Sequence, residues 1–315
     1  MQSAKICILG GSGFVGQHIA GRLIAQGKQV RIATRNRDRH SNLLVLPGIE
    51  LVDANIFDSD SLRKLLADAD CVINLVGILN ESQHNGDGFR RAHVDLPRLI
   101  ADACRVTGVP RLLHMSALNA NVNSSPSYYL RTKAEGENFL HTIASPSLHV
   151  TSFRPSVIFG PGDSFFNRFA GLLKATPFAF PLACPNARFA PVYVGDVADR
   201  FVRALDNKAT FGKRYDLCGP KQYSLIELVR YTAAQLRLRR RIIGLPDTIS
   251  YLQAAMLEWF PGKPFSLDNY RSLQTDSICS QGVSETTSVE SIVPYYIGNR
   301  GRSRNYDRYR SRAHR

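Results

Sequence analysis

The sequence GGSGFVG over residues 10–16 restricts the fold of this chain more than any other feature. It follows a short apolar run over 5–10, typical of a buried strand, and precedes apolar residues at helical spacing over 14–26. Between a strand and a helix, glycines at this spacing allow a tight turn, a close approach of a pyrophosphate and tight packing of the helix on the strand. The free N–H groups at the helix N-terminus attract phosphate. The loop therefore predicts a dinucleotide site lined by Gly10, Ser12, Gly13, Phe14, Val15 and Gly16.

Short apolar runs alternate with amphipathic stretches along the first half of the chain. Further strands are predicted over 29–34, 49–52, 71–77, 111–116 and 149–155, and further helices over 59–67, 89–107 and 127–142. Six strands separated by helices predict an α/β protein. Its core is a Rossmann-type, doubly wound parallel sheet with right-handed crossovers.

Three regions are expected along the chain. Residues 1–155 form the nucleotide-binding domain. Residues 156–280, where Pro and Gly become frequent, form a smaller mixed subdomain for substrate or partner, from which the chain can cross back to the sheet. Its helix over 247–260 either covers a cleft or core, or presents a docking face to a membrane or a partner protein. Residues 281–315 show little periodicity and are expected to form a basic, disordered tail.

Composition narrows the class of protein. Of the 315 residues, 44% are hydrophobic and 21% charged, which is typical of a globular protein. No apolar run reaches the roughly 18 residues of a membrane span, and no signal peptide is recognised. The six cysteines include no CxxC pair. Their scatter argues against a metal site and against a disulfide framework, and it indicates a reducing cytoplasm.

The net charge of +14 predicts an acidic partner. Residues 300–315 hold seven Arg and one Asp, which is +6 of the total. The partner is an anionic lipid, an acidic protein surface or a phosphate group; alternatively, the charge only keeps the chain soluble. Tyr306 and Tyr309 are interleaved with these arginines, but no nucleic-acid-binding module precedes them. This absence argues against a nucleic-acid partner.

The end of the second predicted strand, Thr34-Arg35, indicates which dinucleotide is bound. A site for NAD(H) would place an acidic residue here to hold the ribose 2′-hydroxyl. Arg35, with Arg37 and Arg39 close by, suits a 2′-phosphate instead. The sequence therefore favours NADP(H), with NAD(H) as the alternative. If this loop is only a solvated basic segment, Arg35 is indifferent to the cofactor.

Several further motifs resemble the extended short-chain dehydrogenase/reductase superfamily. They are NLVG at 74–77, the YxxxK motif from Tyr129 to Lys133, RPSVIFGPGD at 154–163 and VYVGDVAD at 192–199. Within that superfamily, the segments HVDLPRLIADAC, HMSALNAN and FPGKPFSLDNYRSLQTDSI resemble an atypical branch. This branch contains the nucleotide-binding accessory subunit of respiratory complex I and its bacterial relatives.

The resemblance implies further cofactor contacts at strand ends. It places Asn55 and Ile56 at the adenine, where the superfamily has Asp followed by an aliphatic residue. The other implied positions are Val76 and Gly77 at the adenine ribose, Ser116 after the fifth strand, and Pro155, Ser156 and Val157 at the nicotinamide. Ordinary packing at strand ends is the alternative for these positions.

The resemblance also implies catalytic roles for Tyr129 and Lys133, which share one face of a helix. In the superfamily the Tyr is the general acid/base, and the Lys lowers its pKa and holds the nicotinamide ribose. Two departures weaken this assignment. Leu118 aligns with the Ser or Thr that polarises the substrate oxygen, and it cannot donate a hydrogen bond to an oxyanion. His93 aligns near an Asn that supports the proton relay.

Two functions remain open. The first is an atypical, NADP(H)-binding protein with an accessory, assembly or sensing role in respiratory-complex or quinone biology. Such a protein would be cytoplasmic, or peripheral to the inner membrane with a membrane or respiratory-complex partner. The alternative is an active NADPH-dependent oxidoreductase, epimerase or dehydratase that uses Tyr129 and Lys133 on a small hydrophobic substrate.

Overall fold

A computed structural model describes residues 4–45, 47–81, 83–260, 264–280 and 285–297. Its centre is a seven-stranded sheet in the order β11-β6-β5-β4-β1-β2-β3, and every neighbouring pair is parallel. The Rossmann-type sheet predicted from the sequence is confirmed, with one strand more than expected. The strands are β1 (Lys5–Leu9), β2 (Gln29–Thr34), β3 (Ile49–Asp53), β4 (Cys71–Asn74), β5 (Arg111–Met115), β6 (His149–Pro155) and β11 (Arg214–Leu217).

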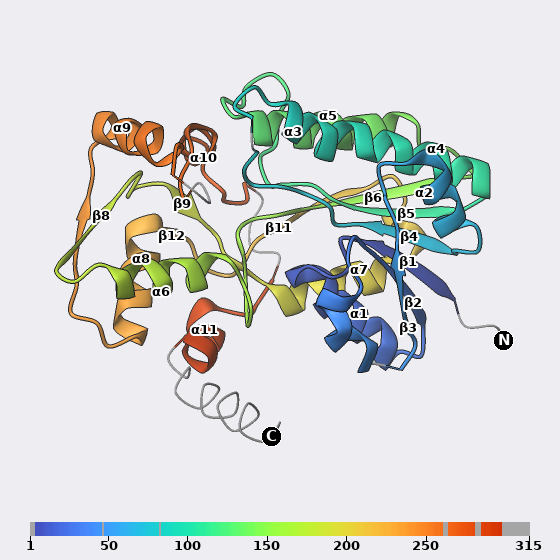
Figure 1. Cartoon of the computed structure of the whole chain (residues 1–315), viewed down its shortest axis with the longest axis horizontal. Helices are drawn as coiled ribbons and strands as arrows, with labels where there is room; N and C mark the ends of the chain where they lie inside the picture. Colours follow the sequence, from blue (N-terminus) through green and yellow to red (C-terminus); the bar gives the residue numbers. More distant parts are fainter. Residues whose placement is uncertain (1–3, 46, 82, 261–263, 281–284, 298–315) are drawn as a thin grey trace.

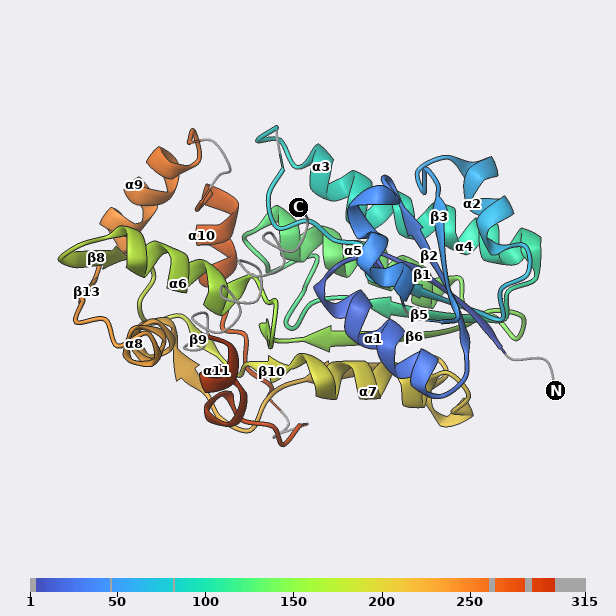
Figure 2. The same ribbon diagram turned by 60° about the horizontal axis from the view of Figure 1, so that its bottom comes forward.

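Helices cover both faces of this sheet (Figures 1 and 2). The first face packs on α1 (Phe14–Ala25) and α7 (Val194–Ala204). The other face packs on α2 (Ser59–Leu66), α4 (Leu96–Thr107) and α5 (Tyr128–Thr142). Since the strand order reverses between β1 and β4, their carboxyl ends border the crevice at which sheets of this kind bind ligands.

A second apolar core lies beside the sheet, on the side of β11 (Figure 1). The chain enters it after β6, crosses back to the sheet through α7 and β11, and then returns. Its elements are β7 (Ile158–Phe159), α6 (Phe165–Ala175), β8 (Ala179–Leu182), β9 (Arg188–Phe189), β10 (Val192–Tyr193), β12 (Tyr223–Ser224), α8 (Leu225–Gln235), β13 (Arg241–Gly244), α9 (Asp247–Leu257), α10 (Leu267–Leu273) and α11 (Val289–Ile297).

The structure corrects the expectation of a disordered tail over 281–315 for part of that region. Helix α11 buries Val289, Val293 and Ile297 in the second core. These residues recur every four positions and therefore share one face of the helix. The Ser-rich segment before them concealed this short period. The arginine-rich residues 300–315 lie outside the described residues.

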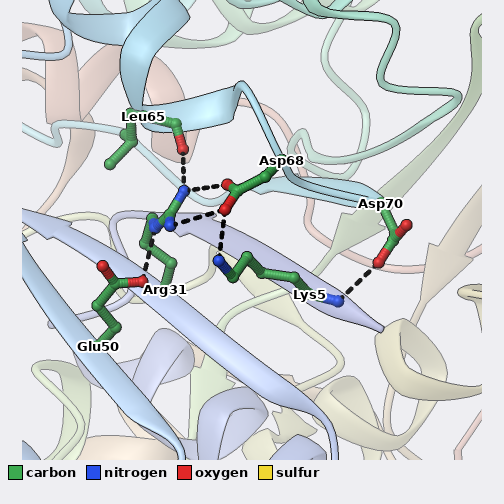
Figure 3. Close-up of polar contacts among 6 residues, drawn as sticks. All are labelled: Lys5, Arg31, Glu50, Leu65, Asp68 and Asp70. Carbon is green, nitrogen blue, oxygen red and sulfur yellow. Dashed lines mark hydrogen bonds and ion pairs between the residues drawn. The ribbon is translucent and has the colours of Figure 1, made fainter. Parts of the chain in front are cut away.

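A cluster of charges connects β1, β2 and β3 (Figure 3). Arg31 of β2 donates to Glu50 of β3 at 2.8 Å, to Asp68 at 2.5 Å and to the carbonyl of Leu65 at 2.8 Å. Lys5, the first residue of β1, donates to the other oxygen of Asp68 at 2.5 Å. Hydrogen bonds from Arg31 and then Lys5 hold the pKa of Asp68 down to about 2. The cluster lies near the amino ends of these strands, whereas the glycine loop lies at their carboxyl ends.

The expectation of no disulfide is wrong for one pair of cysteines. Cys218, directly after β11, is bonded to Cys279, after α10, and their Cα atoms lie 6.1 Å apart. The two residues are 61 positions apart in the sequence, so no local spacing indicates the pair. Only the folding of the second core beside the sheet brings them together. The other four cysteines are buried and free: Cys7, Cys71, Cys104 and Cys184.

Candidate functional site

The glycine loop leads from β1 into α1 at the carboxyl edge of the sheet. Gly10 has a φ of +79°, a left-handed conformation that favours glycine. A Cβ on Gly16 would lie 2.5 Å from the Cα of Gly11 and 2.6 Å from the carbonyl oxygen of Gly10. Only glycine therefore lets α1 begin this close to the turn. Gly13 is exposed and is the N-cap of α1, where it supplies no side-chain cap.

The end of β4 lies directly against this loop. A Cβ on Gly10 would lie 3.3 Å from the backbone nitrogen of Val76. A Cβ on Gly77 would lie 3.0 Å from Nζ of Lys133, which belongs to α5. Lys133 in turn donates to the carbonyl of Met115 at 3.1 Å. The structure thus brings the glycine loop, Val76, Gly77 and Lys133 together at one edge of the sheet.

The ends of β2 and β3 carry another group of predicted residues. The N–H of Ala54 donates to the carbonyl of Thr34 at 3.1 Å, which joins the two strand ends. Arg35 follows β2 and its side chain is exposed. The side-chain oxygen of Asn55 accepts from the N–H of Phe57 at 3.1 Å and is therefore engaged in a turn.

Some predicted residues take part in packing. Val15 packs against the core on the α1 face, Ile56 against the core on the opposite face, and Val157 against the second core. The ring of Phe14 meets that of His18 edge-on, with centroids 5.5 Å apart. At these positions the structure shows a packing role, whether or not a nucleotide also contacts them.

Helix α5 places Tyr129 and Lys133 on one face, as expected from their spacing. Burial lowers the pKa of Lys133 to about 8, partly offset by the carboxylate of Glu137. Burial also raises the pKa of Tyr129 to about 12. At neutral pH the phenol is therefore protonated, so it can give a proton but is a poor base. The lysine keeps most of its positive charge.

His93 lies beside Tyr129, with ring centroids 5.4 Å apart, in a π-helical turn between α3 (Asp87–Arg90) and α4. Its Nε2 accepts from the N–H of Ile78 at 3.1 Å, so the ring proton resides on Nδ1. Nδ1 donates to Thr132 Oγ1 at 3.0 Å, and that hydroxyl donates to the carbonyl of Tyr128 at 2.8 Å. Burial lowers the pKa of His93 to about 2. Both ring nitrogens are thus hydrogen-bonded, and the neutral ring of His93 links the backbone at Ile78 to the hydroxyl of Thr132.

The ends of β5 and β6 hold the remaining predicted residues. Oγ of Ser116 is buried and has no hydrogen-bond partner among the described residues. Leu118 is buried, and its N–H donates to the carbonyl of Pro155 at 3.1 Å. Oγ of Ser156 donates to the carbonyl of Ser277 at 2.7 Å. The position expected to polarise a substrate oxygen therefore holds the aliphatic side chain of Leu118. The nearby hydroxyl of Ser156 is already bonded to Ser277.

Sequence reasoning missed Asp268 of α10. Its carboxylate accepts from the N–H of Tyr128 at 2.6 Å and from the N–H of Tyr129 at 3.1 Å. Ser127 caps the same helix by accepting from the N–H of Leu130 at 3.1 Å. Asp268 is 140 positions from Tyr128. The only signal for it was the resemblance of the surrounding segment, 260–278, to the atypical branch.

The family model described as the NAD dependent epimerase/dehydratase family matches residues 6–218, more than half of the chain. The chain belongs to this family. This match includes the glycine loop, Tyr129 and Lys133, and it ends at Cys218.

Named relatives extend the similarity beyond the family model. The chain is 34% identical over 230 residues to the rat mitochondrial "NADH dehydrogenase [ubiquinone] 1 alpha subcomplex subunit 9", covering 71% of this chain and 59% of the relative. The chain thus spans less than two thirds of that protein's length. The Arabidopsis thaliana protein of the same name is 28% identical, covering 92% and 74% of the two chains. A ceramide reductase of Caulobacter vibrioides is also 28% identical, covering 77% and 74%.

Solved structures share the fold. An epimerase from Methanothermobacter thermautotrophicus has a TM-score of 0.71 at 17% identity, covering 98% of this chain and 95% of its own. A dTDP-glucose 4,6-dehydratase from Streptomyces venezuelae with NAD bound has a TM-score of 0.71 at 18% identity, covering 94% and 98%. These similarities support the epimerase-type Rossmann fold.

The residues present fit a nucleotide cofactor. The cradle at Gly10, Gly13 and Gly16 leaves the start of α1 accessible to phosphate. The hydroxyl of Ser116 is a buried polar group that still lacks a partner among the described residues. Lys133 is a buried cation and donates to the carbonyl of Met115, the residue before Ser116. Nucleotide binding is therefore supported by the site as well as by the family.

Proposed function

We propose that this protein binds NADP(H) as an accessory component of a respiratory complex, in which the dinucleotide has a structural or sensing role. This proposal rests on a site that keeps the cofactor-binding residues of the family but has altered catalytic positions. The phosphate loop and Lys133 are in place, whereas Leu118 offers no donor and His93 is held by the backbone. Ser156 is already bonded to Ser277. Such a site suits tight binding better than carbonyl reduction.

In the proposed complex, the N-terminus of α1 holds the pyrophosphate and Arg35 pairs with the 2′-phosphate. Asn55 and Ile56 face the adenine, and Val76 and Gly77 the adenine ribose. Lys133 donates to the nicotinamide ribose, beside Ser116 and Tyr129, and 155–157 contact the nicotinamide. When bound, the nicotinamide would supply a hydride donor or acceptor. Lys133 and Tyr129 would orient it and hold the nearby proton.

Replacing Arg35 with Glu tests the cofactor preference. A charge-assisted contact contributes about 1.5–3 kcal/mol, so wild type should bind NADPH roughly 10–150 times more tightly than NADH. Arg35→Glu should remove or reverse this preference, because Glu repels the phosphate. Arg105→Glu makes the same charge change at an exposed position in the last turn of α4, outside the proposed site, and serves as the control in titration calorimetry. Equal affinities in wild type, or equal effects of the two variants, would contradict the assignment.

The alternative is an active reductase, epimerase or dehydratase on a small hydrophobic substrate. The retained pair of Tyr129 and Lys133 favours it, and so does the similarity to a protein named ceramide reductase. The respiratory relatives and the altered position at Leu118 favour the accessory role.

Tyr129→Phe separates the two functions. For an accessory binder, NADPH affinity should stay within a few-fold of wild type, because one neutral hydrogen bond contributes about 0.5–1.5 kcal/mol. Lys133→Met should weaken binding more, since it removes a charged donor. An active enzyme should instead lose turnover by roughly 10²-fold or more in Tyr129→Phe, with Tyr128→Phe as the control. A substrate whose turnover collapses while NADPH still binds would overturn the accessory role.

The outer face of α9 supports a role within an assembly. Asp247 accepts from the hydroxyl of Tyr270 at 2.8 Å, and Glu258 pairs with His84 at 2.9 Å, so both carboxylates of this segment are engaged. Six large hydrophobic side chains of residues 247–260 are exposed: Ile249, Tyr251, Leu252, Met256, Trp259 and Phe260. Among the described helices, none has the length and apolar character to cross a bilayer. We infer that this face contacts a respiratory assembly of the kind that the relatives' names describe.

A further inference from the structure

Residues 276–279, which we call the strap, cross the carboxyl ends of β5 and β6. The N–H of Ser277 donates to the carbonyl of Arg188 at 2.8 Å, and its carbonyl accepts from the N–H of Ala190 at 2.9 Å. The side-chain amide of Asn119 donates to the carbonyl of Asp276 at 2.7 Å and to that of Ile278 at 3.2 Å. The strap is therefore held on both sides, by the segment around β9 and by the loop after β5.

The strap covers two positions at which a ligand is expected. Oγ of Ser156 donates to the carbonyl of Ser277 at 2.7 Å. Leu118 is buried in a small apolar cluster that includes Ile278 and Cys279. Ser156 lies at the proposed nicotinamide end of the site, and Leu118 occupies the position of the substrate-polarising residue. The strap therefore occupies the end of the crevice at which the nicotinamide is proposed to bind.

A disulfide links the last residue of the strap to the residue that follows β11. Cys279 is bonded to Cys218, which directly follows β11. Cys279 is partly exposed, whereas Cys218 is buried. Cys279 is therefore the more exposed residue of the pair. Beyond the disulfide, the N–H of Glu285 donates to the carbonyl of Cys218 at 3.0 Å, and Arg200 donates to the Glu285 carboxylate at 2.6 Å.

The remaining cysteines are poorly suited to thiol chemistry. Burial raises the pKa of Cys7 and of Cys104 to about 12, and that of Cys184 to about 11. Burial also raises the pKa of Cys71. Since the thiolate is the reactive form, these four stay inert near neutral pH.

We propose that Cys218–Cys279 is a redox modification site whose reduction releases the strap and opens the nicotinamide end of the crevice. A thiolate of a dithiol reductant attacks Sγ of Cys279, and Cys218 leaves as a thiolate that takes up a proton. The second thiol of the reductant then attacks the reductant's first sulfur, which is bonded to Cys279 in the mixed disulfide. Cys279 is released and is also protonated. Two electrons and two protons pass to the cysteine pair, and the reductant becomes a disulfide. The consequence for nicotinamide rests on the proposed function.

The first test compares the full chain with and without dithiothreitol. Alkylation and mass spectrometry should find Cys218 and Cys279 blocked before reduction and labelled after it. Hydrogen exchange in residues 276–280 should become about tenfold faster on reduction, because the cross-link no longer restrains the strap. Cys279→Ser should exchange like the reduced protein in either condition, and Cys184→Ser should behave like wild type. Free thiols at both positions without reductant, or unchanged exchange, would overturn the proposal.

The second test uses NADPH and 2′-phospho-ADP-ribose, which lacks the nicotinamide. Reduction should tighten NADPH binding by about tenfold, since the nicotinamide then no longer displaces a fastened strap. The fragment should bind equally in both states, because it does not reach Ser156. Equal NADPH affinity in both states would contradict the opening of the crevice. If neither compound binds in either state, the proposed nucleotide site fails, whereas thiol labelling and exchange still decide whether the strap is released.

Discussion

Replacing Glu137 with alanine should lower the free energy of unfolding by about 3 kcal/mol, near the lower end of the range for a broken buried ion pair. The Glu137 carboxylate is 1% exposed and accepts from Arg154 of β6 at 2.9 Å and 3.0 Å. Arg214 of β11 lies 3.1 Å from it. Alanine leaves two arginines without their shared anion. Both arginine side chains still reach solvent. The loss of unfolding free energy should therefore stay below the upper end of the range for a broken buried ion pair, about 5 kcal/mol.

Glu135→Ala is the matched control for this variant. Glu135 lies on the same helix and pairs with Arg90 at 3.2 Å and with Arg98 at 3.7 Å, but at the surface. Exposed ion pairs contribute about 0–1 kcal/mol, so its removal should have little effect. Urea unfolding measures both free energies, and unchanged slopes show that the compactness of the end states is the same. Equal losses in the two variants would show that the buried carboxylate does not hold α5, β6 and β11 together.

Gly16→Ala should lose both nucleotide affinity and stability. Its Cβ would meet the backbone of Gly11 and Gly10 within 2.6 Å, and backbone cannot rotate aside as a side chain can. Moving the loop from the helix N-terminus removes at least two phosphate hydrogen bonds, about 3 kcal/mol together, which is a loss of more than roughly 100-fold in affinity. Overpacking should lower the free energy of unfolding by about 1–3 kcal/mol.

Gly21→Ala provides the control on the same helix. A Cβ on Gly21 meets no atom within 4 Å, and alanine is favoured over glycine inside a helix by about 1 kcal/mol. This variant should therefore bind NADPH as wild type does and unfold at a slightly higher temperature. Thermal unfolding and calorimetric titration measure the pair. A Gly16→Ala protein that binds NADPH normally would show that the loop does not hold the phosphates.

Local patterns predicted the sheet and the phosphate loop because their causes are local. A strand buried on both faces needs a short apolar run, and the turn between β1 and α1 needs glycines at fixed spacing. β11 was missed because only Leu217 is buried in its four residues, which is too little for an apolar run. Helix α11 was missed because its apolar period covers only nine residues after a Ser-rich segment.

The parts of the site that sequence could not reveal depend on long-range contacts. Asp268 caps α5 from 140 positions away, and Ser277 bonds Ser156 from 121 positions away. Each contact uses one common polar residue, and nothing near it in the chain marks its partner. The spacing of Tyr129 and Lys133 predicted that they share one helix face, and the family resemblance implied their roles. Their burial, which sets both pKa values, could not.

The capping of α5 by Asp268 has a consequence for the order in which the molecule is made. A chain is synthesised from its N-terminus, so the glycine loop and β1 to β6 emerge long before residue 268. Until then, the N–H groups of Tyr128 and Tyr129 lack their carboxylate acceptor, and these two groups must bond to water instead. The phosphate half of the crevice can thus form during synthesis. The half around Tyr129 is completed only when α10 arrives.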